Sequence, residues 1–178
     1  GKTTLLRCLM SELEHIEGVV KWSENASVGY CPQDSGSFFD NDLTLMEWMS
    51  QWRRPCHNDL SVRGMLGRML FTDDDANKKA CNCSGGEKNR LLFGMLMMAD
   101  INVLIMDEPT NHMDIEAIDA LNNALKAFEG TLIFVSHDRE FVSSLATRII
   151  DIKDKKLVSF QGSLDEYLSS QVSAKKVA

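Results

Sequence analysis

Two short apolar runs stand out in the pattern of hydrophobic and polar residues. Residues 103–106 are continuously apolar and stop at Asp107-Glu108-Pro109, and residues 131–135 form a similar run that ends in Ser136-His137-Asp138. Continuous apolar runs of this length indicate buried strands of a parallel sheet. Pro109 has no N–H with which to continue a strand. We therefore expect Asp107 and Glu108 at the carboxyl edge of the sheet, where open α/β sheets bind their ligands.

The rest of the pattern predicts helices and short strands around these two runs. Apolar residues at helical spacing and breaks at Gly and Pro define the elements. The expected helices cover residues 2–14, 43–52, 62–70, 84–98, 115–128, 139–146 and 163–170, with a further helix start at 73–75. The expected additional strands cover residues 19–22, 27–31, 149–152 and 157–160, the last two as a hairpin, and residues 35–42 are expected to form a mobile surface loop.

The composition fits one folded domain in a reducing compartment. The chain has 178 residues, of which 44% are hydrophobic and 25% charged, enough for a real core. A net charge of −7 does not favour a nucleic-acid surface over the whole domain. Arg53-Arg54 and Lys78-Lys79 are small basic candidates, although a solvated face explains them better. Five scattered cysteines fit a cytoplasmic protein without a disulfide framework, and no apolar stretch is long enough to span a membrane.

Adjacent carboxylates at a buried edge need something to hold them there. Asp107 and Glu108 repel each other and lose hydration at such an edge. A cation is one answer, and phosphate-bound Mg²⁺ is the obvious candidate. Asp107 would then face the metal, and Glu108 would polarise a water for attack on a γ-phosphate. The alternative is a surface turn that happens to hold two acids, which is the better explanation for an isolated D-E-P triplet.

The first four residues change that balance. Gly1-Lys2-Thr3-Thr4 is the tail of a phosphate-binding loop, G-x-x-x-x-G-K-[ST], and an apolar helix face follows it. Lys2 would reach the β- and γ-phosphates, the Thr3 hydroxyl would ligate Mg²⁺, and the helix N-terminus would add free N–H groups. A match to G-K-T-T alone is weak evidence, because so short a sequence also occurs by chance. Together with Asp107 and Glu108 it becomes a Walker A and Walker B pair.

The segment Ser84-Gly85-Gly86-Glu87 carries the first specific resemblance. Ser84 can cap the helix that begins near Glu87, and a Gly pair lets a ligand approach the backbone. An ordinary capped helix would explain as much. The segment nevertheless resembles the S-G-G-[EQ] signature of ATP-binding cassette (ABC) proteins, P-loop NTPases with a mostly parallel sheet core and a small helical lobe. The resemblance implies that Ser84 and Gly86 bind the γ-phosphate of ATP held by the opposite cassette of a head-to-tail pair.

Three further positions match the same family. Residues 131–138 resemble the switch-histidine loop, which implies that His137 touches the γ-phosphate and helps to hold Glu108 and the water. Gln33 resembles the Q-loop glutamine, which ligates Mg²⁺ together with Thr3 and Asp107. Asp114 falls in the D-loop, which the family places at the seam between two cassettes. The resemblance implies one nucleotide-binding domain over residues 1–178, with the helical lobe at about 41–98 and a C-terminal hairpin and helix at about 148–172.

The narrower match is to the ABC-F subfamily of translation factors, which carry two cassettes in one chain. Residues 107–114 read D-E-P-T-N-H-M-D, and residues 133–142 read I-F-V-S-H-D-R-E-F-V, which is the usual text of the subfamily. The chain is most similar to the C-terminal cassette of the bacterial YbiT-like group. This resemblance implies ATP and Mg²⁺ as cofactors, a second cassette as partner, and contact of the parent protein with the ribosome and tRNA in the cytoplasm.

The pattern departs from the family in two ways. Cys83 stands where the signature usually has Leu, and Met113 replaces another usual Leu. The first glycines of the phosphate loop and the aromatic residue that stacks on adenine would lie upstream of Gly1. The chain therefore looks like an N-terminally truncated fragment, and we expect it to bind ATP poorly by itself, with hydrolysis belonging to the parent protein.

Two other functions share some of these motifs. The ATPase subunit of a membrane transporter has all four, but transporter cassettes usually carry a dipeptide other than Asn111-His112 after D-E-P-T. A nucleotide sensor without hydrolysis is less consistent with the sequence, because all the catalytic positions that the chain spans are intact.

Overall fold

The computed structural model describes residues 1–34, 36–111, 113–153 and 156–177. Within them a parallel sheet holds three strands in the order β1 (Val28–Cys31), β2 (Val103–Asp107) and β3 (Thr131–Val135). All five residues of the central strand β2 are buried. This arrangement confirms the parallel strands predicted from the two apolar runs. β3 is a strand at the edge of this sheet, so its apolar side chains are only partly buried.

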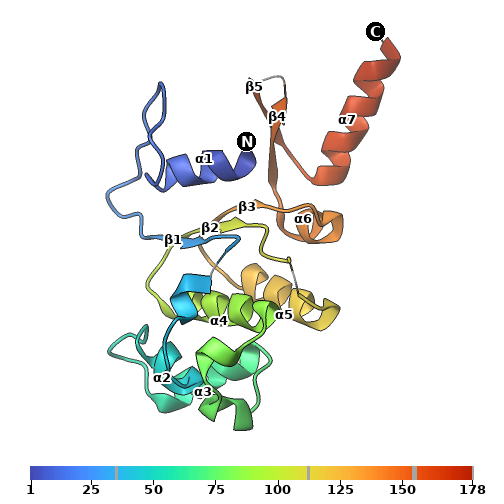
Figure 1. Cartoon of the computed structure of the whole chain (residues 1–178). Helices are drawn as coiled ribbons and strands as arrows, with labels where there is room; N and C mark the ends of the chain where they lie inside the picture. Colours follow the sequence, from blue (N-terminus) through green and yellow to red (C-terminus); the bar gives the residue numbers. More distant parts are fainter. Residues whose placement is uncertain (35, 112, 154–155, 178) are drawn as a thin grey trace.

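Alternation of side chains along β2 assigns its residues to two layers. Val103 and Ile105 pack with Leu6 of α1 (Lys2–Leu9) on one face. Leu104 and Met106 belong to the larger core on the other face. That core is covered by α4 (Gly85–Met98) and α5 (Ile115–Lys126), which lie below the strands in Figure 1, whereas α1 lies above them. The parallel strands therefore lie between two layers of helices, in the α/β fold class that the motifs implied.

Short helices fill the space between β1 and α4 and pack on α4. Polar side chains cap the starts of two of these helices. Thr44 forms a capping box with Glu47, and Asn58 accepts a hydrogen bond from Ser61 N. These elements are η1 (Gly36–Phe39), α2 (Leu45–Ser50), α3 (Asp59–Arg68), η2 (Asp74–Asn77) and η3 (Ala80–Asn82).

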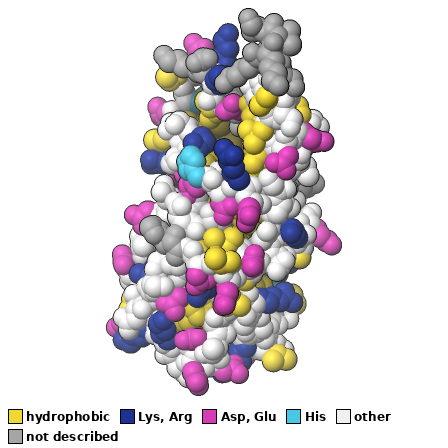
Figure 2. Space-filling model, turned by 90° about the vertical axis from the view of Figure 1, so that its right-hand side faces the viewer, with side chains coloured by type: hydrophobic (Ala, Val, Ile, Leu, Met, Phe, Trp, Pro, Cys, Tyr) yellow, Lys and Arg dark blue, Asp and Glu magenta, His cyan; other side chains and the backbone are white. Residues whose placement is uncertain are grey.

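The chain ends in α6 (Arg139–Leu145), the antiparallel hairpin of β4 (Arg148–Lys153) and β5 (Lys156–Gln161), and α7 (Leu164–Val177). The hairpin was expected from the sequence, but α7 continues beyond the predicted end at residue 170. Tyr167 of α7 donates a 2.6 Å hydrogen bond to Asp151 of β4 and so fixes the helix against the hairpin. Figure 2 shows hydrophobic side chains among charged ones at this end of the molecule. Every helix within the described residues is too short or too polar to cross a bilayer.

The predictions for residues 2–22 were partly wrong. The first helix ends at Leu9 rather than near Glu14, and Ser11 takes a left-handed φ of 58°. Residues 19–22 are not a strand, and Val19 is 87% exposed. Trp22 instead turns back toward α1 and donates an indole hydrogen bond to the carbonyl of Leu9 at 3.2 Å. A strand needs a partner for its N–H and C=O groups, and the local sequence does not specify that partner.

The prediction of a mobile surface loop at residues 35–42 was also wrong in its central part. Ser35 lies outside the described residues, but Gly36–Phe39 form a 3-10 helix. Phe39 is completely buried and stacks on Trp48 with 4.8 Å between ring centroids. Trp48 Nε1 donates a 2.9 Å hydrogen bond to the carbonyl of Phe38. Residues 73–75 likewise lead into a 3-10 helix, not an α-helix. The segment after β1 is therefore anchored in the core of the small helices.

This anchor can be tested with two neighbouring phenylalanines. Phe39→Ala should lower the free energy of unfolding by about 3–5 kcal/mol, because it removes a buried ring and leaves a cavity. Phe38→Ala is the matched control, since Phe38 is 38% exposed, and it should cost less than about 1 kcal/mol. Urea denaturation of the chain and its two variants measures both. Equal losses in the two variants would contradict the buried position of Phe39.

Candidate functional site

Asp107 closes the central strand on the face that carries α1. It lies two residues after Ile105 and therefore shares the face on which Val103 and Ile105 contact Leu6 of α1. Lys2 begins that helix, and Figure 1 shows its amino end on the side toward which β2 points. The residues predicted as the Walker A tail and the Walker B aspartate thus lie on the same face of the sheet and toward the same edge.

The carboxylate of Asp107 is buried without a partner. The residue is only 1% exposed, and neither of its oxygens has a hydrogen-bond donor among the described residues. Its charge acts on its neighbours: burial, and after it the Asp107 charge, raise the pKa of the Tyr30 hydroxyl and raise the pKa of the Cys31 thiol to about 12. An unpaired buried carboxylate is costly. The site therefore fits a cation that would take up these two oxygens.

Glu108, the residue directly after Asp107, holds an unusual backbone conformation. Its φ is 51°, in the left-handed region that non-glycine residues rarely occupy. Two hydrogen bonds keep it there: Glu108 N donates to Val135 O at 2.8 Å, and Asn111 N donates to Glu108 O at 3.1 Å. Strained residues of this kind gather at functional sites. The backbone therefore turns directly after Asp107 and is held in that turn by hydrogen bonds.

His137 contacts the carboxylate of Glu108 through both its backbone and its ring. Its backbone N donates to Glu108 Oε2 at 3.1 Å, and its ring Nε2 lies 3.4 Å from Glu108 Oε1. The Glu108 side chain is 10% exposed, whereas that of His137 is 81% exposed. The imidazole therefore lies over the carboxylate with most of its surface open to a ligand.

Short polar contacts brace the loop on which His137 lies. The Ser136 hydroxyl is 3.4 Å from the Thr110 hydroxyl and accepts a 3.0 Å hydrogen bond from Asp138 N. Asp138 in turn caps α6 by accepting from the N–H groups of Glu140 and Phe141. The loops after β2 and β3 are thus joined to each other and to the next helix.

The other predicted nucleotide contacts lie around this centre. Gln33 is exposed two residues after Cys31, and Cys31 pairs with Met106 of β2, so Gln33 follows the same edge of the sheet. Residues 1–4 are exposed, and the first hydrogen bond of α1 runs from Leu5 N to Gly1 O. The N–H groups before Leu5 consequently have no acceptor within the helix.

The residues predicted for the signature and the D-loop cap two helices. They were expected to face a second cassette and not this centre. Ser84 caps α4 through Glu87 N at 3.3 Å, and both Ser84 and Gly85 are exposed, while Gly86 is buried. Asp114 caps α5 through Ala117 N at 2.8 Å. His112, part of the dipeptide that separates the two ATPase types, lies outside the described residues.

Sequence reasoning missed how several polar residues are held. Lys78 was assigned to a solvated face, yet its ammonium lies 2.8 Å from Glu87 Oε1. Asn89 of α4 donates a 3.2 Å hydrogen bond to the carbonyl of Asn111 and so ties α4 to the loop after β2. No regular spacing marks these pairs, since their members lie in different elements. The one available signal was the S-x-x-E pattern of the Ser84 capping box.

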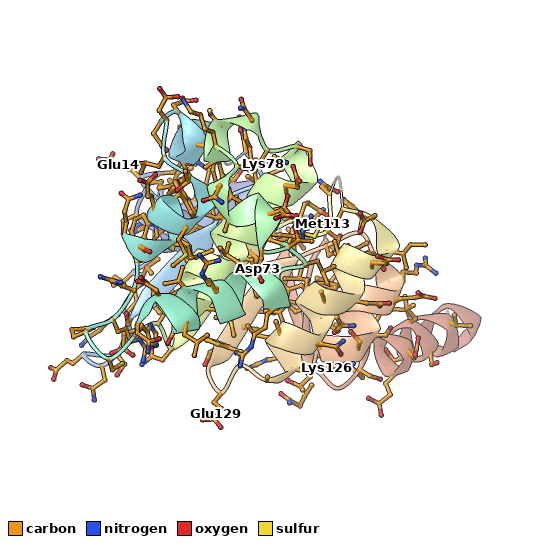
Figure 3. All side chains as sticks on the ribbon, turned by 90° about the horizontal axis from the view of Figure 1, so that it is seen from below. Glu14, Asp73, Lys78, Met113, Lys126 and Glu129 are labelled. Carbon is orange, nitrogen blue, oxygen red and sulfur yellow. The ribbon has the colours of Figure 1, made fainter. Side chains whose placement is uncertain are left out.

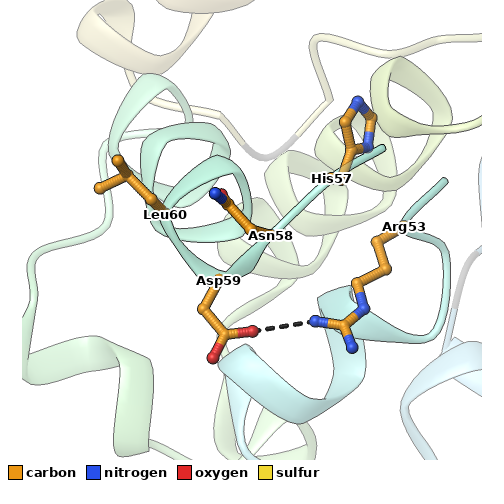
Figure 4. A pocket seen from close by; sticks show the side chains of 5 residues that line it. All are labelled: Arg53, His57, Asn58, Asp59 and Leu60. Atoms are coloured by element: carbon orange, nitrogen blue, oxygen red, sulfur yellow. Dashed lines mark hydrogen bonds and ion pairs between the residues drawn. The ribbon is translucent and has the colours of Figure 1, made fainter. Parts of the chain in front are cut away.

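The basic pair Arg53-Arg54 is neutralised locally. Arg53 pairs with Asp59 at 2.9 Å, beside the open depression lined by His57, Asn58 and Leu60 that Figure 4 shows. Arg54 pairs with Asp100 at 3.2 Å and donates to the carbonyl of Ala99. Nearby acids balance both charges, which is consistent with a solvated face. The depression lies at the connection between α2 and α3 and at the start of α3, and Asp107 is not among its lining residues.

Comparisons with known proteins show the family and the fold of the chain. The sequence profile of a family described as ABC transporter matches residues 1–111. The chain is 56% identical to the ATP-binding protein YbiT of Escherichia coli over 96% of its length and 34% identical to ABC transporter F family member 5 of Arabidopsis thaliana over 98%. It covers 32% and 25% of these two relatives. An archaeal ribosome recycling factor, solved in complex with a ribosomal stalk protein, superposes with a TM-score of 0.76 at 23% identity, over 96% of this chain and 34% of that one.

The unpaired state of Asp107 predicts an unusual mutational effect. Asp107→Asn should raise the free energy of unfolding in metal-free buffer by about 1–3 kcal/mol, because a buried charge without a partner is removed. Asp119→Asn is the control, since Asp119 is exposed on α5, and it should change stability by less than about 0.5 kcal/mol. Thermal unfolding in EDTA measures both variants. A destabilised Asp107→Asn would show that the carboxylate has a partner in the folded chain.

Proposed function

Because the chain belongs to the ABC-F family of ATP-binding cassette proteins, we propose that it serves its parent protein as an ATPase cassette. The cassette binds ATP with Mg²⁺, closes on a second cassette in a head-to-tail sandwich, and reopens after hydrolysis. The observation that carries the proposal is the carboxyl edge of the sheet, where the buried Asp107, the strained Glu108 and the exposed His137 converge.

The phosphate end of the nucleotide has its ligands on the face of α1. Lys2 would pair with the β- and γ-phosphates, and the free N–H groups at the start of α1 would add donors. The two unpaired oxygens of Asp107 fit a magnesium ion, with Thr3 and Gln33 as further oxygen ligands. When bound, Mg²⁺ neutralises negative charge on the phosphate oxygens.

Glu108 and His137 have separate tasks in the proposed hydrolysis. Glu108 orients the attacking water and takes up its proton, which requires the carboxylate to be held in a fixed position. The hydrogen bond from His137 N to Oε2 fixes it. The exposed imidazole then contacts the γ-phosphate with the face that Glu108 leaves open. The left-handed turn at Glu108 is what allows Asp107 to face the metal while its neighbour faces the water.

The signature residues act on the nucleotide of the opposite cassette. Ser84 Oγ accepts from Glu87 N, so the hydroxyl proton can be donated to a phosphate oxygen. The exposed Gly85 lets that phosphate approach the backbone, and Gly86, although buried, offers its N–H at the same helix start. Asp114 belongs to the seam between the cassettes. Closure then depends on the γ-phosphate because both cassettes touch it.

The parent protein supplies the partners. The chain spans a third or less of the two curated relatives, so the second cassette belongs to the rest of the parent chain or to a second copy. ABC-F membership supports a cytoplasmic protein that acts on the ribosome and tRNA during translation. The alternative partner is a transporter in the membrane. Fractionation of cells with the tagged full-length protein distinguishes them: we expect co-sedimentation with ribosomes in ATP, and recovery in the membrane fraction would favour the transporter.

Replacement of the proposed base tests the chemistry. Glu108→Gln in the full-length protein should lower the ATP turnover number by at least about 100-fold and leave the cassettes closed on ATP. Phosphate release and retention of radiolabelled ATP measure the two effects. Glu129→Gln is the matched control, because Glu129 is exposed beyond the end of α5, and it should turn over normally. Unchanged phosphate release from Glu108→Gln would remove Glu108 from this role.

A further inference from the structure

The left-handed turn at Glu108 is closed by Asn111. Asn111 N donates a 3.1 Å hydrogen bond to the Glu108 carbonyl, so the peptide group of Asn111 forms the end of that turn. A φ of 51° strains a residue other than glycine, and such a conformation persists only where the surrounding structure determines it. The contacts that hold Asn111 therefore also determine how firmly Glu108 is held.

A side chain of α4 holds Asn111 from the other side. Asn89 Nδ2 donates to Asn111 O at 3.2 Å, and the bond joins two partly buried residues that lie 22 positions apart in the chain. Partial burial limits the access of water that would otherwise compete for the carbonyl. Asn111 thus accepts a hydrogen bond from α4 at its carbonyl and donates one to Glu108 through its N–H.

α4 is a firm support for this bond. Residues 91–96 of the helix are all buried, and most of them belong to the larger core. Figure 3 shows Met113, two residues after Asn111, between α4 and α5, and Met113 packs against the same core. Because a close-packed core resists small displacements, the Asn89 amide is presented to the loop after β2 from a nearly fixed position.

The helix that holds Asn111 also carries the predicted signature at its start. Ser84 is the N-cap of α4, and Asn89 follows it on the same helix. At about 1.5 Å of rise per residue, the two positions are separated by roughly 7.5 Å along the helix axis. One short stretch of helix therefore contains the residue proposed to meet the opposite nucleotide and the residue that holds the turn at Glu108.

We propose that Asn89 is a positioning residue for Glu108, which it holds through Asn111 so that the carboxylate is aligned with the attacking water. The inference rests on the proposed function, in which Glu108 is the base and Ser84 meets the opposite nucleotide. Because Asn89 and Ser84 share one helix, hydrolysis in this cassette depends on the placement of the helix that contacts the nucleotide of the other cassette. Asn89 acts without touching either nucleotide.

Steady-state hydrolysis by the full-length protein tests this role. Asn89→Ala removes the amide donor and should lower kcat for ATP by about tenfold, the order expected for the loss of one hydrogen bond in the transition state. KM for ATP should stay within about twofold, because the contacts to the nucleotide are unchanged. Asn89→Gln keeps an amide donor and should retain more activity than Asn89→Ala. Asn123→Ala is the matched control, since Asn123 is exposed on α5, and it should turn over normally.

A double-mutant cycle with Glu108→Gln separates positioning from general stabilisation. Asn89→Ala should lower the residual turnover of Glu108→Gln no further, because its effect passes through the carboxylate. Equal losses with and without the carboxylate, or an unchanged kcat in Asn89→Ala, would overturn the inference. If Asn89→Ala does not fold, Asn89→Asp, which loses the amide donor at nearly the same size, enters the same cycle. Normal turnover by Glu108→Gln itself would refute the proposed function, which is a separate failure.

Discussion

The structure depends on the pairing of β2 between β1 and β3. This strand buries all of its side chains, and it divides them between two cores by simple alternation. The same alternation carries a carboxylate into the buried layer at its last residue. The apolar residues before Asp107 contribute hydrophobic stabilisation, and part of that stabilisation offsets the cost of a charge without a partner. The strand that contributes to both hydrophobic cores therefore also carries the buried carboxylate of Asp107.

The site is built from contrasts between neighbouring residues. Asp107 is buried without a hydrogen-bond donor among the described residues, whereas Glu108, in a left-handed backbone conformation, accepts a bond from the loop after β3, so the two adjacent acids have different surroundings. The Glu108 carboxylate is held by a backbone N–H, and the imidazole above it remains exposed. Farther away, Ser84 and Asp114 serve as helix caps. A cap is a conformationally fixed polar side chain at a helix start, which makes it a suitable contact for another molecule.

Local signals predicted the strands and most helices, because an apolar run, a Pro or a capping Ser acts over a few residues. The apolar stretches of β2 and β3, the hairpin and α4 all followed from such signals. The failures required information from distant residues. Phe39 is buried because Trp48 lies over it, residues 19–22 found no strand partner in the structure, and Lys78 meets Glu87 across a 3-10 helix. The motifs predicted the site residues, but no local pattern indicates that Asp107 has no hydrogen-bond donor among the described residues while Glu108 accepts a bond from His137 N.

The left-handed φ of Glu108 has a consequence for the evolution of the chain. Glycine would occupy this conformation without strain, so the position is better suited to a residue that has no carboxylate at all. Selection for folding by itself, as in a library screened for expression level, would drift toward glycine there and lose the carboxylate that accepts the His137 N–H. Persistence of glutamate at such a position in a living lineage would then record selection for something other than stability.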